Sequence, residues 1–452
     1  MRFDRGMRGE FGQRRVAVIG AGISGMSAAW LLGKSLEVVL YEAGDKPGGH
    51  ANTVFAPTAV GPVPVDTGFI VYNDRNYPNL VALFDHLDVP TQASNMSFSA
   101  SLDGGAFEYS GSGLTGLFGQ PLNALRPRFW RILSDILRFY REAPKALNRL
   151  NLASKTLGEY LDENGYSNAF VTDHLLPMGA AIWSTTTKRM RDYPLHAFIR
   201  FCDSHGLLAL TDRPRWRTVT GGSREYVSRL MSDYCGELRT SRAVREIRRE
   251  VGTVVITDRD GNRDTFTDVV IATHADLALA MLAEPDARER ELLSAISYTS
   301  NKAVLHADTS LMPRRRNVWS SWNYIGASDD CGERQLCVTY WMNRLQGIDP
   351  ATPLFVTLNP HQKIASERII ATFDYDHPLF DQRALASQKE LWDLQGRGGV
   401  WFCGAYFGSG FHEDGLQSGL AVAEAISGER RPWTVRDDSG RLPCEIGYAA
   451  AQ

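Results

Sequence analysis

The sequence has 452 residues, which is long enough for two or three domains with a well-buried core. A hydrophobic fraction of 43% and a charged fraction of 22% are those of an ordinary soluble globular protein. The formal net charge of -3 leaves no overall basic excess, so nucleic acid is not expected as a partner.

Six cysteines are scattered without a CxxC pair, which argues against a zinc cluster or a disulfide framework and favours a reducing cytosol. No histidine–carboxylate spacing suggests a metal site. Residues 1–13 lack the apolar core of a signal peptide, and no apolar run is long enough for a transmembrane helix. We therefore expect a cytoplasmic protein that associates at most peripherally with the inner face of the membrane.

The first predicted elements form one unit at the N-terminus. A short β-branched strand over 14–19 ends at Gly20-Ala21-Gly22-Ile23-Ser24-Gly25, and an Ala- and Leu-rich helix over 26–32 follows. A second strand over 38–41 ends on Glu42, 22 positions after the first glycine. This strand–GxGxxG–helix–strand–acid order is typical of a dinucleotide-binding domain.

Each part of this unit has a physical role. Gly20 permits a tight turn, Gly22 lets the backbone approach a pyrophosphate, and Gly25 allows close contact between helix and strand. The helix N-terminus offers free N–H groups and a positive dipole end to phosphates. Glu42 can accept hydrogen bonds from ribose hydroxyls, and its charge disfavours a 2′-phosphate. The alternative is a glycine-rich turn that binds nothing.

Later motifs narrow the choice of dinucleotide. Residues 43–50 read Ala-Gly-Asp-Lys-Pro-Gly-Gly-His, residues 66–69 read Asp-Thr-Gly-Phe, and residues 400–419 hold Val-Trp-Phe-Cys-Gly-Ala and then Gly-Phe-His-Glu-Asp-Gly-Leu-Gln-Ser-Gly. Together with an internal Gly-Gly turn at 221–222, they resemble the flavin-containing amine oxidase and phytoene desaturase superfamily. The resemblance implies FAD, held non-covalently because no motif marks a covalent attachment. Residues 49–53 and 410–415 resemble in particular a bacterial branch of predicted FAD-binding proteins often encoded beside cyclopropane-fatty-acid synthases.

The resemblance also implies the fold and the cofactor contacts. We expect an α/β fold, with a Rossmann-like FAD-binding domain assembled from the discontinuous segments 1–75, 215–290 and 395–430. An inserted α+β substrate domain would span 76–214 and 291–394, and a C-terminal tail 431–452. The implied cofactor-binding residues are Gly20, Gly22, Ile23, Ser24, Gly25, Glu42, Ala43, Lys46, Gly48, Gly49, His50, Thr67, Gly68, Phe69, Val244, Thr273, Gly404, Asp414, Gly415 and Leu416.

Two positions depart from the family pattern. His50 stands where many members carry arginine. Ala405-Tyr406 replaces the acidic residue that often follows the closing glycine, so Glu413 or Asp414 takes that role or no residue does.

A basic amphipathic helix is predicted over 125–150. Its apolar face is formed by Phe129, Ile132, Leu133, Ile136, Leu137 and Tyr140, and seven Arg or Lys residues occupy the other faces. Such a helix either packs on the domain with a solvated basic face or makes peripheral contact with an anionic membrane.

Three residues are candidates for catalysis. Lys302, in a strand predicted over 298–305, matches a lysine that holds water against flavin N5 in amine-oxidising relatives; the alternative is an exposed strand lysine. Phe411 stands at a cage position where many amine oxidases have tyrosine, which favours an apolar substrate. His412 is either a proton carrier or a structural residue at a helix entry. Aromatic residues at 319, 322, 324, 340 and 341 form either a substrate cage or ordinary packing.

We therefore predict an FAD-dependent oxidoreductase that transfers hydride from an apolar, lipid-like substrate to flavin N5, such as a fatty acyl chain of a membrane lipid. One alternative is a flavin amine oxidase acting on a small amine. Another is a non-catalytic flavin-binding partner in lipid modification. No second GxGxxG follows a strand, so electrons are expected to leave to oxygen, a quinone or another carrier. The oligomeric state stays open.

Overall fold

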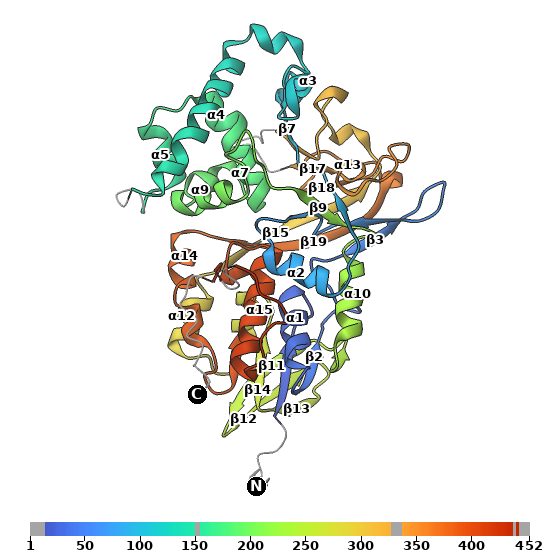
Figure 1. Cartoon of the computed structure of the whole chain (residues 1–452), viewed down its shortest axis with the longest axis vertical. Coiled ribbons are helices and arrows are strands. Elements are labelled where there is room, and N and C mark those ends of the chain that lie inside the picture. The colour runs from blue at the N-terminus through green and yellow to red at the C-terminus, as the bar shows by residue number, and fades with distance from the viewer. Residues whose placement is uncertain (1–13, 150–153, 327–336, 437–439, 443–452) are drawn as a thin grey trace, which may run out of the picture. The chain divides into compact units, whose positions relative to one another are not determined.

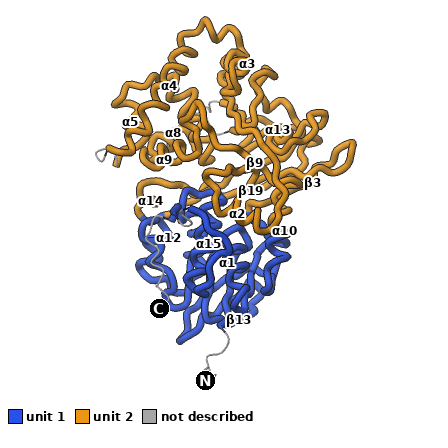
Figure 2. The backbone as a smooth tube through the Cα atoms, in the orientation of Figure 1, with its two compact units in different colours: residues 1–49, 227–295, 387–452 blue, residues 50–226, 296–386 orange. Residues whose placement is uncertain are grey.

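The computed structural model describes residues 14–149, 154–326, 337–436 and 440–442. Residues 1–13, the end of the helix predicted over 125–150 and most of the predicted C-terminal tail lie outside these ranges. The chain divides into two compact units, which Figure 2 colours separately. The first unit comprises residues 1–49, 227–295 and 387–452, and the second comprises 50–226 and 296–386.

A five-stranded parallel sheet forms the centre of the first unit, in the order β10-β2-β1-β14-β20. Its strands are Glu237–Arg239, Glu37–Tyr41, Arg15–Ile19, Asp268–Ile271 and Val400–Phe402. The β-branched run Val16–Ile19 is buried, as expected for a parallel strand covered on both faces. The parallel arrangement brings the carboxyl ends of the strands to one edge of the sheet.

Two helices pack tightly against each other in this unit: α1 (Ile23–Leu32) and α15 (His412–Ser427), both visible in Figure 1. A Cβ atom added to Gly419 would lie 2.2 Å from the Ser24 carbonyl oxygen, so the approach depends on glycine. The rest of the unit consists of an antiparallel sheet β11-β12-β13 and smaller helices. Their bounds are Val244–Glu250, Thr253–Asp258, Arg263–Phe266, α10 (Arg224–Asp233, at the unit boundary), α11 (Ala275–Met281) and α12 (Ala287–Leu293).

The second unit is built on a seven-stranded sheet in the order β19-β15-β18-β17-β16-β7-β8. Its strands are Ile369–Leu379, Ser297–His306, Phe355–Leu358, Val338–Trp341, Trp322–Ile325, Phe98–Leu102 and Phe107–Ser110. A hairpin β3–β4 (Thr53–Ala56 and Val63–Asp66) and a small sheet β5-β9-β6 (Tyr72–Asn73, Trp216–Val219 and Thr91–Ala93) complete the β-structure of this unit. The main helices are α2 (Pro78–His86), α3 (Gly113–Leu117), α4 (Pro127–Ala146), α5 (Leu157–Glu163), α7 (Leu176–Trp183), α8 (Thr187–Arg191), α9 (Leu195–Ser204), α13 (Met342–Gln346) and α14 (Gln382–Gln388, at the unit boundary).

The predicted basic helix exists as α4, but its apolar face is rotated from the prediction. Phe129 and Ile132 are buried as predicted, together with Phe139, whereas Leu137 is 54% exposed. Leu137 lies seven residues, two helical turns, after the exposed Trp130, and therefore falls on the solvent side.

The predicted fold class is confirmed: a parallel sheet with covering helices is assembled from separated segments, beside a mixed α+β unit. The two compact units divide the chain differently from the prediction: residues 50–75 and 215–226 belong to the second unit, and residues 291–295 and 387–394 belong to the first. For residues 50–75 and 215–226 the reason is local, since the Asp66 amide of β4 donates to the Gln346 side chain and β9 pairs with β6. In the described part of the chain, no helix is long and apolar enough to cross a membrane.

Candidate functional site

The turn between β1 and α1 has the geometry that the glycine pattern predicts. Gly20 has φ +98°, a conformation that favours glycine, and its amide donates to the Tyr41 carbonyl at 2.8 Å. A Cβ atom on Gly25 would lie 1.8 Å from the Gly20 carbonyl oxygen. The helix therefore meets the strand at backbone contact distance.

The N-terminus of α1 is open to a ligand. Its N-cap is Gly22, which has no side chain to cap the helix, and its first turn contains no acidic residue. The first-turn amides have no partner within the helix. A Cβ atom on Gly22 would meet nothing within 4 Å. This open, amide-lined surface fits the pyrophosphate of a dinucleotide.

Glu42 lies beside this turn, at the end of β2. Its two carboxylate oxygens accept hydrogen bonds from the Ala21 amide at 2.8 Å and the Gly44 amide at 2.7 Å. Each oxygen keeps a further lone pair, which suits a ribose hydroxyl. The backbone carbonyl of Glu42 accepts from the Arg242 amide at 2.9 Å, which brings the segment leading into Val244 to the same place.

The Gly48-Gly49 pair joins the same cradle. The Gly48 amide donates to the Ala21 carbonyl at 2.8 Å, and a Cβ atom on Gly49 would lie 3.2 Å from Gly22 Cα. Ala43 and Lys46, which precede this pair, are exposed. The family motif after β2 thus folds back onto the glycine turn.

Two further strands contribute to this edge of the sheet. Thr273 follows β14, and its methyl group would lie 3.3 Å from a Cβ atom on Gly20. Gly404 follows β20, and its amide donates to the Ser418 hydroxyl of α15 at 3.0 Å. Ligands of open parallel sheets bind at this carboxyl edge.

The first turns of α15 and α1 also adjoin each other. A Cβ atom on Gly415 would lie 2.7 Å from Ser24 Oγ and 3.0 Å from Ile23 Cγ2. Leu416, the next residue, is fully buried. The positive ends of both helix dipoles therefore lie close together, which fits an anionic cofactor.

The carboxylates of α15 are turned into the protein. Asp414 accepts from the Phe411 amide at 2.7 Å and from Arg441 at 3.1 Å, and it is fully buried. Glu413, also fully buried, accepts from Gln417 at 3.0 Å. Both carboxylates therefore already form hydrogen bonds within the protein at the start of α15.

The side chains of Phe411 and His412 begin α15 and are half-buried. Burial lowers the pKa of His412 from 6.5 to about 3. His412 is therefore a neutral imidazole at physiological pH.

Four of the predicted cofactor residues belong to the second unit and lie together there. The Phe69 amide donates to the His50 carbonyl at 2.7 Å, and a Cβ atom on Gly68 would lie 2.3 Å from the same oxygen. The Thr67 amide donates to the Asn52 carbonyl at 2.9 Å.

Sequence reasoning missed the residues that surround this loop. The Tyr375 hydroxyl lies 3.0 Å from Asn52 Nδ2 and 2.8 Å from Thr67 Oγ1, and the rings of His50 and Tyr375 are 4.9 Å apart. The His377 ring lies 5.5 Å from that of His50. The alternation of polar and apolar residues over 369–379 is typical of a strand. This pattern could have placed Tyr375 and His377 on one face of a strand.

Lys302 lies on the other face of β15 from this group. It is paired with Asp374, whereas its neighbour Asn301 is paired with Tyr375. Directly opposed residues of two strands share a face. The Lys302 ammonium lies 3.3 Å from the Asp374 carboxylate, and both side chains are more than half exposed. The role of Lys302 beside the flavin stays a prediction.

Two residues of the predicted aromatic zone, Trp319 and Trp341, pack within the second unit. Trp319 contacts Trp341 edge-on at 5.4 Å and Phe355 at 5.8 Å. The Arg316 guanidinium lies 3.7 Å over Trp319 and 5.0 Å over Trp341. Both tryptophans thus already have a cation on a ring face, which disfavours a cage for a substrate amine.

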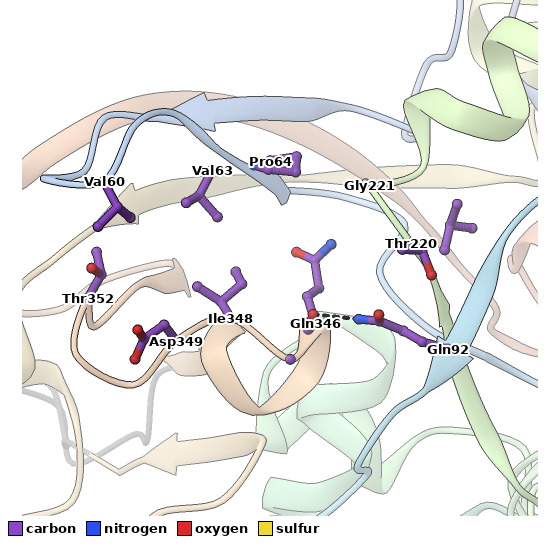
Figure 3. A pocket seen from close by; sticks show the side chains of 13 residues that line it. Val60, Val63, Pro64, Gln92, Thr220, Gly221, Gln346, Ile348, Asp349 and Thr352 are labelled. Atoms are coloured by element: carbon purple, nitrogen blue, oxygen red, sulfur yellow. Dashed lines mark hydrogen bonds between the residues drawn. The ribbon is translucent and has the colours of Figure 1, made fainter.

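A pocket of about 260 Å³ opens within the second unit, between the β3–β4 hairpin and the segment after α13 (Figure 3). Val63 and Ile348 point toward each other across it, and Gln92 donates to the Gln346 carbonyl at 2.6 Å. None of the predicted cofactor or catalytic residues lines this pocket.

Comparison with known proteins gives one family and several structures. Residues 23–348 match the family described as flavin containing amine oxidoreductase. A putrescine oxidase bound to putrescine is similar with a TM-score of 0.66 at 14% identity, covering 92% of this chain and 99% of that one. Cyclohexylamine oxidase from Brevibacterium oxydans IH-35A gives 0.63 at 17%, with 92% and 99% covered. The fatty acid isomerase of P. acnes that produces CLA gives 0.63 at 16%, with 90% and 97% covered. At these identities the structures show a shared fold. No curated protein sequence matches the chain.

Proposed function

The chain belongs to the family of flavin-containing amine oxidoreductases, and from this premise we propose that it dehydrogenates an apolar substrate, a fatty acyl chain of a membrane lipid. FAD is the cofactor of this enzyme; when bound it would accept a hydride from one carbon of the substrate, while the neighbouring carbon releases a proton to water and a C=C bond forms. We further propose that the residues of the first unit hold FAD non-covalently. Precipitation with acid should then release all of the FAD into the supernatant.

The observation that carries the proposed substrate is the chemistry of the α15 entry. Phe411 offers a phenyl ring, and His412 beside it is neutral. Glu413 and Asp414, the only carboxylates of this turn, are fully buried and engaged. A helix N-terminus disfavours a cation. This surface suits a neutral, apolar substrate better than an ammonium group.

In this proposal the protein positions and desolvates the substrate. Phe411 supplies an apolar contact to the acyl chain. Because Glu413 and Asp414 already accept hydrogen bonds inside the protein, binding of the chain does not strip water from a charged carboxylate. A similar fold serves a fatty acid isomerase, which supports an acyl substrate on this scaffold. The alternative, oxidation of a small amine, is supported by the family name, by two structural neighbours and by Lys302.

Anaerobic mixing separates the two candidates. The yellow holoenzyme is mixed without oxygen with phospholipid vesicles or fatty acid micelles, and separately with a panel of amines. The proposal expects the flavin absorbance to bleach with an acyl substrate only. Bleaching by an amine and by none of the lipids would establish the alternative.

A further inference from the structure

An exposed apolar surface covers part of the helical region of the second unit. Five of the eleven large hydrophobic side chains that are exposed in the described part of the chain lie within residues 114–137. We call these five residues the apolar platform: Leu114, Leu122, Leu125, Trp130 and Leu137. Leu122 is 63% exposed and Leu125 80%, although leucine is normally buried.

Hydrogen bonds and ring contacts join most of the platform into one surface. The Trp130 indole donates to the Ala124 carbonyl at 2.8 Å, which fixes the turn bearing Leu122 and Leu125 (η2, Pro121–Leu125) against the first turn of α4. The Phe118 ring lies 6.4 Å from Trp130, and the Phe118 amide donates to the Leu114 carbonyl at 2.9 Å. Platform residues thus come from α3, η2 and α4 (Figure 1).

The exposed charges of α4 are mainly positive. The exposed residues of α4 are Pro127, Trp130, Arg131, Ser134, Leu137, Arg141 and Lys145. They include three cations and no carboxylate. Asp135 is buried and accepts from the Ser167 amide at 2.9 Å, while Glu142 is half-buried beside Arg141.

We propose that the apolar platform and the cations of α4 dock this protein on an anionic lipid bilayer. Leucine and tryptophan side chains insert at the boundary of headgroups and acyl chains, and Trp130 has the amphipathic ring that favours this depth. Arg131 and Lys145 complement the negative surface of such a bilayer. A second copy of the chain is a poorer occupant, because a two-fold interface would place these cations against each other.

This inference goes beyond the proposed substrate, because binding to a bilayer requires no turnover. It is tested on the holoenzyme by co-sedimentation with vesicles of phosphatidylcholine containing about 30% phosphatidylglycerol, and with vesicles of phosphatidylcholine alone. We expect binding to the anionic vesicles that weakens with added salt. The assay measures the fraction of protein bound to vesicles and not the reduction of the flavin. Its result therefore does not depend on whether the proposed substrate is correct.

Matched variants assign the binding to the surface. The double variant Leu122→Glu, Leu125→Glu should lower the partition coefficient at least about tenfold. Its control is Leu210→Glu, because Leu210 lies in the same unit and is 64% exposed but lies outside the platform. Arg131→Glu should lower partitioning about fivefold or more. Its control, Arg189→Glu, alters an exposed arginine of α8.

Three results would overturn the proposal. The first is a wild-type protein that binds neither kind of vesicle. The second is equal loss of binding in the platform variants and their controls. The third is a wild-type dimer that becomes monomeric in the platform variant without any vesicle binding, which would identify the platform as a protein interface. Thermal unfolding of each variant confirms that the substitutions leave the fold intact.

Discussion

The carboxylate of Asp66 accepts hydrogen bonds from both the amide and the hydroxyl of Ser223, a residue 157 positions later in the chain. The same carboxylate accepts from the Thr53 hydroxyl at 2.6 Å and from the Gln346 side chain at 3.0 Å. Asp66 therefore joins the β3–β4 hairpin, the Gly-Gly turn before α10 and helix α13. It is 1% exposed, so these contacts are shielded from solvent.

Replacing Asp66 by alanine should destabilise the protein by on the order of 3 kcal/mol, because several buried donors would lose their acceptor. Urea unfolding of the apoprotein measures the change. Asp376→Ala, on the exposed face of β19, is the control and should change stability by less than about 0.5 kcal/mol. Equal effects of the two variants would mean that Asp66 does not join these segments energetically.

The stability contributed by Asp66 should depend on pH. Burial raises the pKa of this carboxyl from 3.8 to about 6, against the lowering effect of its hydrogen bonds. Between these values the folded protein binds more protons than the unfolded chain, so stability falls as pH rises through this range and is level above it. The stability deficit of Asp66→Asn relative to the wild type should therefore shrink from about pH 4 to pH 7.

The buried histidines act in the opposite direction but do not disturb this comparison. Burial lowers the pKa of His174 and of His306 to about 4, so both are neutral when folded and destabilise the protein as pH falls below 6.5. They contribute equally to the wild type and the variant. A deficit that grows with pH would show that the pKa of Asp66 is not raised.

Two glycines of the same loop should respond differently to substitution. Gly22→Val should fold normally, because a Cβ atom there meets nothing within 4 Å and φ is -77°. Its side chain would occupy the surface assigned to the pyrophosphate, so the Kd for FAD should rise at least about a hundredfold. Fluorescence titration of the apoprotein with FAD measures this.

Gly25→Ala is the contrasting variant. Its Cβ atom would lie 1.8 Å from the Gly20 carbonyl oxygen, so α1 must move away from the sheet and the apoprotein itself should lose stability. Unfolding of the two apoproteins separates the effects. If Gly22→Val retained FAD as tightly as the wild type, the assigned phosphate site would be wrong.

The strength of the sequence prediction differed between the two units. In the first unit, each predicted cofactor residue follows a strand at a spacing that the motif fixes. The motif therefore predicted the strand or helix as well as the residues that lie next to it. The strand predicted over 14–19 is β1, one residue shorter. The helix begins at Ile23 rather than Met26, because the last residues of the GxGxxG pattern already form its first turn.

In the second unit, the important contacts depend on strand pairing. Tyr375 reaches Thr67 and Asn52 because β19 pairs with β15 in a register that sets Asn301 opposite Tyr375. Alternation along one strand predicts which residues share a face, but not which other strand pairs with it. For the same reason, the sequence did not show that Asn301 lies opposite Tyr375 and Lys302 opposite Asp374.

His412 should not control the pH dependence of flavin reduction. With its pKa lowered to about 3, it stays neutral throughout the usual assay range. His412→Gln keeps a neutral polar side chain, so the profile of reduction rate against pH should keep its shape even if the rate changes. Stopped-flow reduction across the range measures it. Disappearance of an ascending limb near neutral pH in this variant alone would show that His412 titrates there.

Lys302 and Phe411 distinguish the two candidate substrates. If the substrate is an acyl chain, Lys302→Met should change the rate of flavin reduction by less than about threefold, because an exposed ion pair with Asp374 contributes little. Asp374→Asn, which breaks the same ion pair from its partner's side, is the matched control and should behave alike. A large loss of rate in Lys302→Met only would indicate that the ammonium itself acts on the reaction, as the amine alternative requires.

Phe411→Tyr tests the same question from the other unit. It adds one hydroxyl to a half-buried ring at the entry of α15. With an acyl substrate, the KM should rise about tenfold, because the hydroxyl must lose water without gaining a partner on the chain. With an amine substrate the same hydroxyl can accept a hydrogen bond, so the KM should stay level or fall. The two variants therefore give opposite patterns for the two substrates. With an acyl substrate, Phe411→Tyr raises the KM and Lys302→Met leaves the rate of flavin reduction nearly unchanged. With an amine, Lys302→Met lowers the rate and Phe411→Tyr does not raise the KM.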